Sequence, residues 1–547
     1  QEMNKKNSEN SITNSSIAMV AKDEKEGKHT NEKGLGWFVT ALFVMGDIAG
    51  GGIVALPGAM IQMDFYPGLV LAVIMTLVTM YTSVLLGEGW VILQRRWPQY
   101  REHCRKPYSE MGARAMGTAV KNIVSACIAI TQFGTAVVFL LLSAKNIGDF
   151  LKAFFSVNFS YCYLIIIVGV GLLPLTFLKS PQDFCYYYLS PELLVYFEYR
   201  ANLIILNTMK VEEQRDLQHL PIRSILWAVV AAMVTTTGAL ILVIIGAGLD
   251  YSTCAPDRGV NDKLVITNYF LGLGTLLFSY GGHSAFPTIV HDMRKPYHFN
   301  RSSILAFAAV ACMYIPVSIM GFVTYGNSIQ DSIINSIQIK GIQQAVNILI
   351  TLHCILALTI IFNPLNQEIE EILRVPQRFG WQRAAVRTTV MIAVIFVAES
   401  LPTFGPLLNI VGGSTLTLTS LVFPALFYLY LAVGEEKSLQ QKGREIDSDK
   451  PPTFMEVLTQ SPKIRLAACG FVIVFGILGG ASATFSAIRE LATTKFAVPC
   501  YVQPFLHANG TEDEKTSLNC CGMWQNITRS GDSSICSPFH DFYVQFE

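Results

Sequence analysis

The motif Gly-Gly-x-x-Ala-x-Pro occurs twice in this chain, at residues 51–57 and 281–287, each time inside an apolar run long enough to cross a lipid bilayer. Glycine frees the backbone and proline removes an amide donor, so helix turns beside the motif tend to unwind. The polar groups released must face protein, water or a ligand, because hydrocarbon satisfies none of them. Matching interruptions in two halves of a membrane chain indicate a ligand site near the middle of the bilayer, as in inverted-repeat transporters. The alternative is close packing or kinking of the helices, which both residue types also allow.

Composition places most of the chain in a membrane. Of 547 residues, 51% are hydrophobic and 15% are charged, against about 25% charged in an ordinary soluble domain. The formal net charge is zero, so neither a nucleic-acid partner nor a polybasic membrane-surface protein is indicated. Residues 1–34 are polar and lack the apolar core of a secretory signal, so the apolar run from Trp37 is expected to remain as an uncleaved span.

Apolar runs of about 17 to 25 residues count as membrane spans. With the amino terminus in the cytosol, the predicted inner loops carry 25 Lys and Arg residues and the outer loops 5, as the positive-inside rule requires. No Lys or Arg falls inside a predicted span. The predicted fold is an all-α integral membrane protein with eleven spans, at residues 37–61, 67–93, 122–144, 161–178, 225–249, 264–290, 303–325, 342–363, 388–401, 404–433 and 466–487.

These spans predict the domain organisation. Two repeats of five spans each are followed by one extra helix, and the first and sixth helices are the discontinuous ones. The predicted parts are a polar cytosolic tail, the first repeat with its insert, the second repeat, a cytosolic loop, the eleventh span and an extracytosolic tail, at residues 1–34, 35–249, 264–433, 434–465, 466–487 and 488–547.

The last 60 residues carry the signs of a non-cytosolic segment. Four cysteines there indicate disulfides, with three connectivities open, and Cys162 and Cys254 are also predicted on the outer side and available to join them. The cysteines elsewhere, in spans or an inner loop, are expected to be plain thiols. The tail cysteines and the two glycosylation sequons beside them are Cys500, Cys520, Cys521, Cys536, Asn509 and Asn526.

A segment at residues 185–226 interrupts what would otherwise be a short loop between the fourth and fifth spans. It holds apolar runs but none that spans, because they are broken by Pro191, Glu192, Glu198 and Arg200. Three interpretations stay open: an inserted cytosolic segment, a piece of coding sequence retained or assembled in error, or an amphipathic interfacial helix.

The two interruptions offer complementary chemistry. A helix that restarts near Ile53 presents free backbone amides and about half a positive charge, which suits a carboxylate. Unwinding at the second motif exposes carbonyl oxygens that accept bonds from an ammonium group. Together the amides and the carbonyl oxygens fit a zwitterion, so free amino acids are the leading candidate substrates. Aromatic side chains at 278 and 280 would flank the cavity, or else belong to ordinary core packing. The predicted substrate-binding residues are Gly50, Gly51, Gly52, Ile53, Phe278, Ser279, Tyr280, Gly281 and Gly282.

Two titratable residues are candidates for ion coupling. Asp47 lies ten residues after Trp37, about 15 Å along a helix, and an ionised carboxylate at that depth is costly unless it is paired. It is assigned to proton binding or to a coupling cation; the alternative is a protonated or helix-capping Asp. His283 is either a proton carrier or a neutral histidine that holds unwound backbone. His353 is expected to be a packing histidine, and no metal site is indicated by any spacing.

Several motifs together resemble the amino acid/auxin permease family, and most closely its invertebrate amino acid transporter branch. The resemblance runs from about residue 35 to residue 490, apart from the insert, which departs from the family pattern. It implies eleven helices with a five-plus-five inverted repeat, proton- or sodium-coupled movement of amino acids, and a substrate site lined by residues 49–54 and 278–283. The motifs are GGGIVALP at 50–57, LPLTFLKSPQDF at 173–184, FSYGGHSAFPTIVHDM at 278–293 and TYGNSIQDSIINSI at 324–337.

The sequence therefore predicts a secondary active amino acid transporter, a symporter working by alternating access. Small neutral amino acids are favoured because no fixed positive charge at depth would pair with an acidic side chain. The alternative is an amino acid sensor that signals to a cytosolic partner. An enzyme is not expected, since no nucleophile with a base, metal cluster or phosphate loop is found. Beyond the coupling ion, H⁺ or Na⁺, no cofactor is expected. The expected partners are the amino acid and the lipid bilayer, in the plasma membrane or an endolysosomal membrane, with the C-terminus extracellular or luminal; the oligomeric state stays open.

Overall fold

A computed structural model gives the structure of the chain. It describes residues 29–177 apart from 33, 103, 156 and 158, then residues 223–259, 265–376, 380–440, 450–493, 499–502 and 520–529, and the single residues 531 and 536. For residues 223–230 only the backbone is described. The insert predicted at 185–226 lies outside the described residues except for its last four, which belong to a helix.

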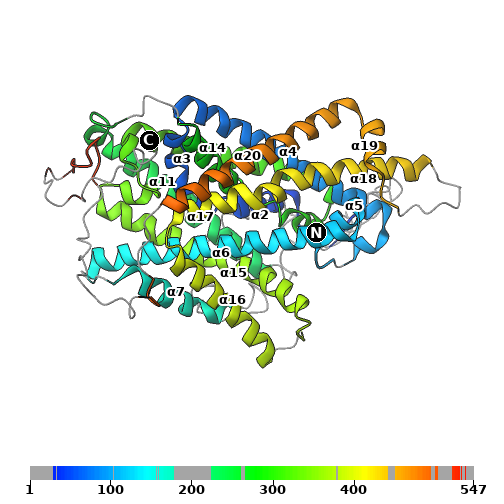
Figure 1. Cartoon of the computed structure of the whole chain (residues 1–547), viewed down its shortest axis with the longest axis horizontal. Helices are drawn as coiled ribbons and strands as arrows, with labels where there is room; N and C mark the ends of the chain where they lie inside the picture. The colour runs from blue at the N-terminus through cyan, green and yellow to red at the C-terminus, as the bar shows by residue number, and fades with distance from the viewer. Residues whose placement is uncertain are drawn as a thin grey trace, which may run out of the picture.

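The described residues form helices and isolated bridges but no β-strand, so the all-α prediction is confirmed. Most long helices run roughly along the long axis of the molecule, with α5 and α19 towards one end and the start of α7 towards the other (Figure 1). The helices are α2 Trp37–Ile48, η1 Gly51–Ala55, α3 Leu56–Gln62, α4 Phe65–Arg96, η2 Pro98–Arg101, α5 Pro107–Met116, α6 Thr118–Phe155, α7 Tyr161–Thr176, α11 Arg223–Cys254, α12 Ile266–Ser279, α13 Phe286–His291, η3 Pro296–His298, α14 Phe299–Tyr325, η4 Gly326–Ser328, η5 Ile333–Ser336, α15 Lys340–Ile372, α16 Trp381–Ser400, α17 Phe404–Val411, η6 Gly412–Leu416, η7 Leu418–Val422, α18 Phe423–Gln440, α19 Phe454–Gln460 and α20 Lys463–Thr493.

Helices lie in all eleven segments predicted from hydropathy. Within the described residues, seven helices are long and apolar enough to cross a bilayer, and the bent pair at the first motif makes eight. Two further apolar helices, α7 and α12, are shorter. The number of membrane crossings and the inverted repeat therefore remain predictions.

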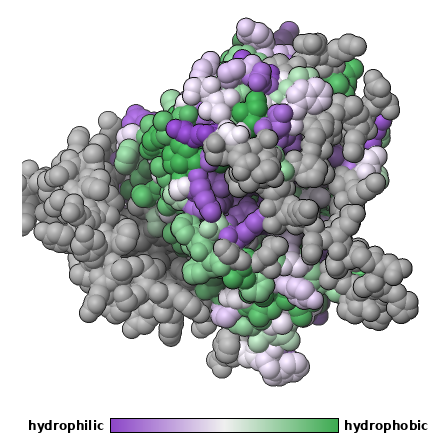
Figure 2. All heavy atoms as spheres, turned by 90° about the vertical axis from the view of Figure 1, so that its left-hand side faces the viewer, coloured by the Kyte–Doolittle hydropathy of each residue, from purple (hydrophilic) through white to green (hydrophobic). Residues whose placement is uncertain are grey.

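Three disulfides fasten the C-terminal tail, and two of them reach the helix bundle: Cys162–Cys500, Cys254–Cys521 and Cys520–Cys536. The first joins the tail to the start of α7 and the second to the end of α11, so a pairing confined to the four tail cysteines is excluded. Asn526 is exposed, as a glycosylation site requires, and Asn509 lies outside the described residues. Figure 2 shows this end of the molecule, where hydrophilic side chains gather between apolar ones.

The loop between α14 and α15 closes the same end of the bundle. Most of residues 326–337 are buried. A methyl group added at Gly58 of α3 would lie 3.8 Å from the Gln330 carbonyl oxygen. Asp250, at the end of α11, accepts hydrogen bonds from the Gln338 amide and the Tyr325 hydroxyl, each at 2.8 Å. The loop thus packs across α3 and α11 at the end where the tail is attached.

A buried ion cluster joins α15 and α16 at the opposite end. Glu370 Oε1 accepts hydrogen bonds from Arg383 Nε at 3.0 Å and from Arg387 Nε at 2.6 Å. Arg387 Nη1 also donates to the Thr176 carbonyl oxygen of α7. Both arginines precede the predicted ninth span at 388–401, and they belong to the same helix, because α16 begins at Trp381.

Candidate substrate site at two interrupted helices

The first interruption separates α2 from η1. The two halves, Trp37–Ile48 and Gly51–Gln62, meet at an angle of 50°. The amides of Gly51 and Gly52 stand at the start of η1, where a helix supplies no acceptor of its own. The Ile53 amide donates to the Gly50 carbonyl oxygen at 3.2 Å, so the prediction of a free amide at Ile53 is wrong. Two amides, at Gly51 and Gly52, remain for an anion.

The second interruption lies between α12 and α13, where residues 280–285 form turns and no helix. Gly282 has φ of 151°, a backbone conformation that other residues rarely adopt. The carbonyls of Phe278 and Gly282 accept from the amides of Gly281 and Ala285, both at 3.0 Å. Within the described residues, the carbonyls of Tyr280 and Gly281 accept no such backbone bond, so they are the oxygens left for a cation.

The two interruptions lie against each other near the centre of the bundle. A methyl group added at Gly52 would come within 2.7 Å of Ser279 Oγ, and one added at Gly282 within 2.6 Å of Asp47 Oδ2. Because every residue with a Cβ needs that space, only glycine permits this approach at both positions. Both stretches are therefore discontinuous and adjacent, as the sequence motif predicts.

Tyr314 of α14 joins the two interruptions directly. Its hydroxyl lies 3.0 Å from the Ile48 carbonyl oxygen at the end of α2 and 2.9 Å from the Ser279 carbonyl oxygen at the end of α12. The side chain is 2% exposed. One donor thus faces both helix ends, which removes Ser279 from the carbonyls offered to a ligand. The sequence carried no signal for this contact, since Tyr314 lies in an uninterrupted helix.

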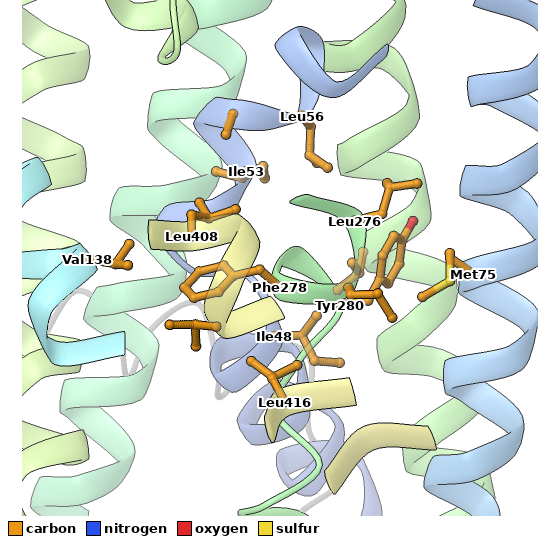
Figure 3. Packing of buried hydrophobic residues seen from close by; sticks show 14 of the residues in the cluster. Ile48, Ile53, Leu56, Met75, Val138, Leu276, Phe278, Tyr280, Leu408 and Leu416 are labelled. Atoms are coloured by element: carbon orange, nitrogen blue, oxygen red, sulfur yellow. The ribbon is translucent and has the colours of Figure 1, made fainter. Parts of the chain in front are cut away.

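The aromatic residues predicted to flank the site point in opposite directions (Figure 3). The Phe278 ring lies towards the first interruption, where a methyl group at Gly52 would be 2.9 Å from Phe278 Cδ1. Tyr280 is directed to α4: its hydroxyl accepts a hydrogen bond from Thr76 Oγ1 at 2.8 Å, and only 1% of the residue is exposed. Phe278 is thus placed beside the first interruption, whereas the Tyr280 hydroxyl is held against α4; that the Tyr280 ring flanks the site stays a prediction.

Asp47 keeps an exposed side chain although it stands beside the second interruption, next to Gly282. In the described part of the chain its carboxylate makes no hydrogen bond and no ion pair. The neighbouring residues Ile48 and Ala49 are buried, as is all of η1. Around the first interruption, the exposed residue is thus at the end of α2, and η1 is buried.

His283 is held against α4. Its Nε2 lies 2.9 Å from the Thr79 carbonyl oxygen and 3.1 Å from Thr82 Oγ1, and the ring is fully buried. Because a carbonyl oxygen only accepts, Nε2 carries a proton and donates to Thr79. This contact agrees with the interpretation of His283 as a histidine that holds unwound backbone. A role of His283 in proton transfer stays a prediction.

Two further side chains border the first interruption, from α6 and α15. A methyl group added at Gly50 would lie 3.4 Å from Phe139 Cζ and 3.8 Å from His353 Nε2. Both side chains are buried, at 4% and 2% exposure. Phe139 carries no sequence signal and His353 is expected from sequence to be a packing residue, because neither lies in a motif.

Replacing Tyr314 with phenylalanine is expected to lower the free energy of unfolding by about 1–3 kcal/mol, because two buried carbonyl oxygens lose their shared donor. Substrate affinity should fall as well, since the helix ends are no longer held together. The thermal unfolding midpoint of the purified protein in detergent measures the first effect. Tyr163→Phe, at an exposed position of α7, is the control, and equal midpoints for the two variants would contradict this role of Tyr314.

A bundle of apolar helices with two facing interruptions defines a membrane protein of the transporter class. Residues 33–445 match the family described as transmembrane amino acid transporter protein, and the chain belongs to that family. The predicted family is thereby confirmed, and the branch within it stays a prediction. The family consists of transporters, in line with the expectation that the chain is no enzyme.

Two plant proteins are among the curated relatives that the chain is similar to. The chain is 22% identical over 449 residues to amino acid transporter AVT1D of Arabidopsis thaliana, covering 81% of this chain and 68% of that one. It is 27% identical over 245 residues to auxin transporter-like protein 4 of Medicago truncatula. This match covers 44% of this chain and 49% of that one. Among solved structures, MhsT in complex with L-phenylalanine is similar at 12% identity and a TM-score of 0.48, covering 84% of this chain and all of that one.

Proposed function

We propose that this protein is a secondary active transporter of amino acids that works by alternating access. The observation that carries the proposal is the approach of two interrupted helices, at which a Cβ atom added to Gly52 would lie 2.7 Å from Ser279 Oγ and 3.1 Å from Ser279 Cα. The first interruption offers the amides of Gly51 and Gly52, and the second offers the carbonyls of Tyr280 and Gly281. Amides at a helix start suit a carboxylate, and free carbonyls suit an ammonium group. An α-amino acid carries both groups on one carbon, so a single molecule matches both ends.

Small neutral amino acids fit these surroundings best. Phe139 and Phe278 stand beside the first interruption and restrict the room for a long side chain. The described ion pairs that hold buried arginines lie at the start of α16 and not at the interruptions. An acidic side chain would therefore enter the site without a fixed opposite charge, which disfavours it strongly in a low-dielectric interior.

The exposure pattern supports access from one side at a time. The half of the site towards η1, α3 and the α14–α15 loop is buried, whereas Asp47 on the other side is exposed. With the amino terminus in the cytosol, this arrangement corresponds to an inward-facing conformation. Asp47 beside the substrate site is the proposed carrier of the coupling ion, H⁺ or Na⁺, and His283 is a second candidate.

The disulfides support the proposed orientation. Disulfides form and persist in oxidising compartments, and the two that leave the tail join it to the start of α7 and the end of α11. Those two helix ends and the tail therefore belong on the extracellular or luminal side. The amino terminus then lies in the cytosol if eleven helices cross the membrane.

Uptake by the purified protein in liposomes tests the proposal. A panel of twenty labelled amino acids, with pH and sodium gradients varied separately, should show concentrative uptake of at least one small neutral amino acid. Empty liposomes and liposomes without a gradient are the controls. Saturable binding without flux would instead favour the alternative, an amino acid sensor that signals to a cytosolic partner. Neither binding nor flux for any of the twenty would overturn the amino acid assignment.

A further inference from the structure

His353 of α15 has one ring nitrogen that the protein leaves without a partner. The side chain is 2% exposed, and Nε2 makes no hydrogen bond within the described residues. The same atom faces the first interruption, 3.8 Å from the place where a methyl group on Gly50 would lie. A buried polar atom without a partner costs about 1–3 kcal/mol, so a position of this kind requires an explanation.

The other ring nitrogen fixes both the orientation and the tautomer of His353. Nδ1 lies 2.8 Å from Thr236 Oγ1 and 3.3 Å from the Ala232 carbonyl oxygen, both on α11. Since a carbonyl oxygen only accepts hydrogen bonds, the contact with Ala232 places the proton on Nδ1. Nε2 is then an acceptor, and α11 holds it facing the interruption.

His283 makes a useful comparison, because its Nδ1 also lacks a partner. That ring packs against aromatic side chains, with centroid distances of 4.7 Å to Phe286 and 6.0 Å to Phe307. The nitrogen of His353 faces glycine backbone at the candidate site instead. Of the two histidines, His353 is therefore the one whose free acceptor has a ligand site in front of it.

We propose that His353 Nε2 accepts a hydrogen bond from the ammonium group of the bound amino acid. This inference rests on the proposed function and adds one residue to its site. An ammonium group has three donors, so the bond to His353 adds to those offered by the carbonyls of Tyr280 and Gly281. The carboxylate of the same molecule takes the amides of Gly51 and Gly52, next along the chain from Gly50.

Two substitutions separate this role from packing. In His353→Asn the shorter amide reaches the position of Nδ1 and leaves nothing at Nε2, whereas in His353→Gln the longer amide places an acceptor near Nε2. Removing one hydrogen bond to a charged group corresponds to a loss of about 10- to 100-fold in affinity. The affinity of His353→Asn for L-alanine should fall by about that factor, and His353→Gln should recover a large part of it.

The measurement is binding of labelled L-alanine to purified full-length protein in detergent, with displacement by propionate, which lacks the amine, as a second readout. Cys354→Ala, the adjacent buried position on α15, controls for altered packing. Propionate displacement should be the same in the wild type and in His353→Asn. Affinity of His353→Asn within threefold of the wild type, or equal losses in the Asn and Gln variants, would overturn the role of His353.

The outcomes also separate this inference from the proposed function. If the wild type binds L-alanine and His353→Asn binds it equally well, the site stands and His353 is only a packing residue. If the wild type binds none of twenty amino acids, both fail. Should His353→Asn not yield folded protein, Thr236→Val removes the nearer of the two Nδ1 partners and leaves only the Ala232 carbonyl oxygen to orient the ring. That variant is expected to weaken L-alanine binding several-fold, and unchanged affinity would overturn the inference.

Discussion

Replacing Gly51 with leucine is expected to abolish amino acid binding while the protein still reaches the membrane. A Cβ atom at this position would lie 2.9 Å from Phe139 Cε1 and 3.3 Å from Leu142 Cδ2, so the side chain must displace α6 or swing over the backbone amides. Either movement removes the amide pair from a carboxylate. Loss of two hydrogen bonds to a charged group corresponds to a decrease of at least about 100-fold in affinity.

Binding and uptake of a labelled small neutral amino acid measure this effect. The matched control is Gly470→Leu on α20, where an added Cβ meets no atom within 4 Å. Surface labelling and size-exclusion chromatography show whether each variant inserts and stays monodisperse. Uptake by Gly51→Leu at the wild-type rate would mean that the substrate carboxylate binds elsewhere.

Asp47→Asn is expected to remove the dependence of uptake on the driving ion gradient. Asparagine has nearly the same shape but neither binds a proton nor carries a charge, and the native carboxylate has no protein partner in the described structure that would give it another role. Uptake driven by a pH or sodium gradient should fall to the rate seen without a gradient, whereas exchange of labelled for unlabelled amino acid should persist. Uptake into liposomes, with each gradient imposed separately, is the measurement.

Asp257→Asn provides the control for Asp47, because this exposed carboxylate lies on the loop after α11, away from the interruptions. It should leave gradient-driven uptake unchanged. If Asp47→Asn still concentrates amino acid in proportion to the gradient, coupling belongs to another group, and His283 becomes the next residue to replace.

The interruptions themselves were predictable from sequence. Glycine and proline act through their own backbone, so the repeated motif locates both discontinuities without knowledge of the fold. Side-chain directions beyond the motif were not predictable in the same way. Periodicity fixes which face a residue occupies only while the helix continues, and Tyr280 is the first residue after α12. Its ring is therefore placed by contacts with α4.

Residues that complete the site from other helices gave no local signal. Tyr314 and His353 lie in continuous apolar helices, where a polar residue has the same sequence appearance whether it packs, binds a helix end or faces a ligand. Their contacts with α2, α12 and α11 arise only when the bundle assembles. The disulfides were predictable only in part. Composition predicts disulfide-bonded cysteines in the tail, but which cysteines of α7 and α11 they pair with depends on the three-dimensional arrangement.

The bond between Cys162 and Cys500 joins positions 338 residues apart, with the helices from α11 to α20 between them in the chain. At about 5–20 residues per second, a ribosome needs about 17–70 s to add the second partner after the first. During that interval Cys162 is a free thiol in the proposed oxidising lumen, where it can form mixed disulfides with other thiols and with disulfide isomerases. The native bond can close only after α20 and Cys500 have been synthesised, so the Cys162–Cys500 pair marks a chain that has been extended past its last described helix.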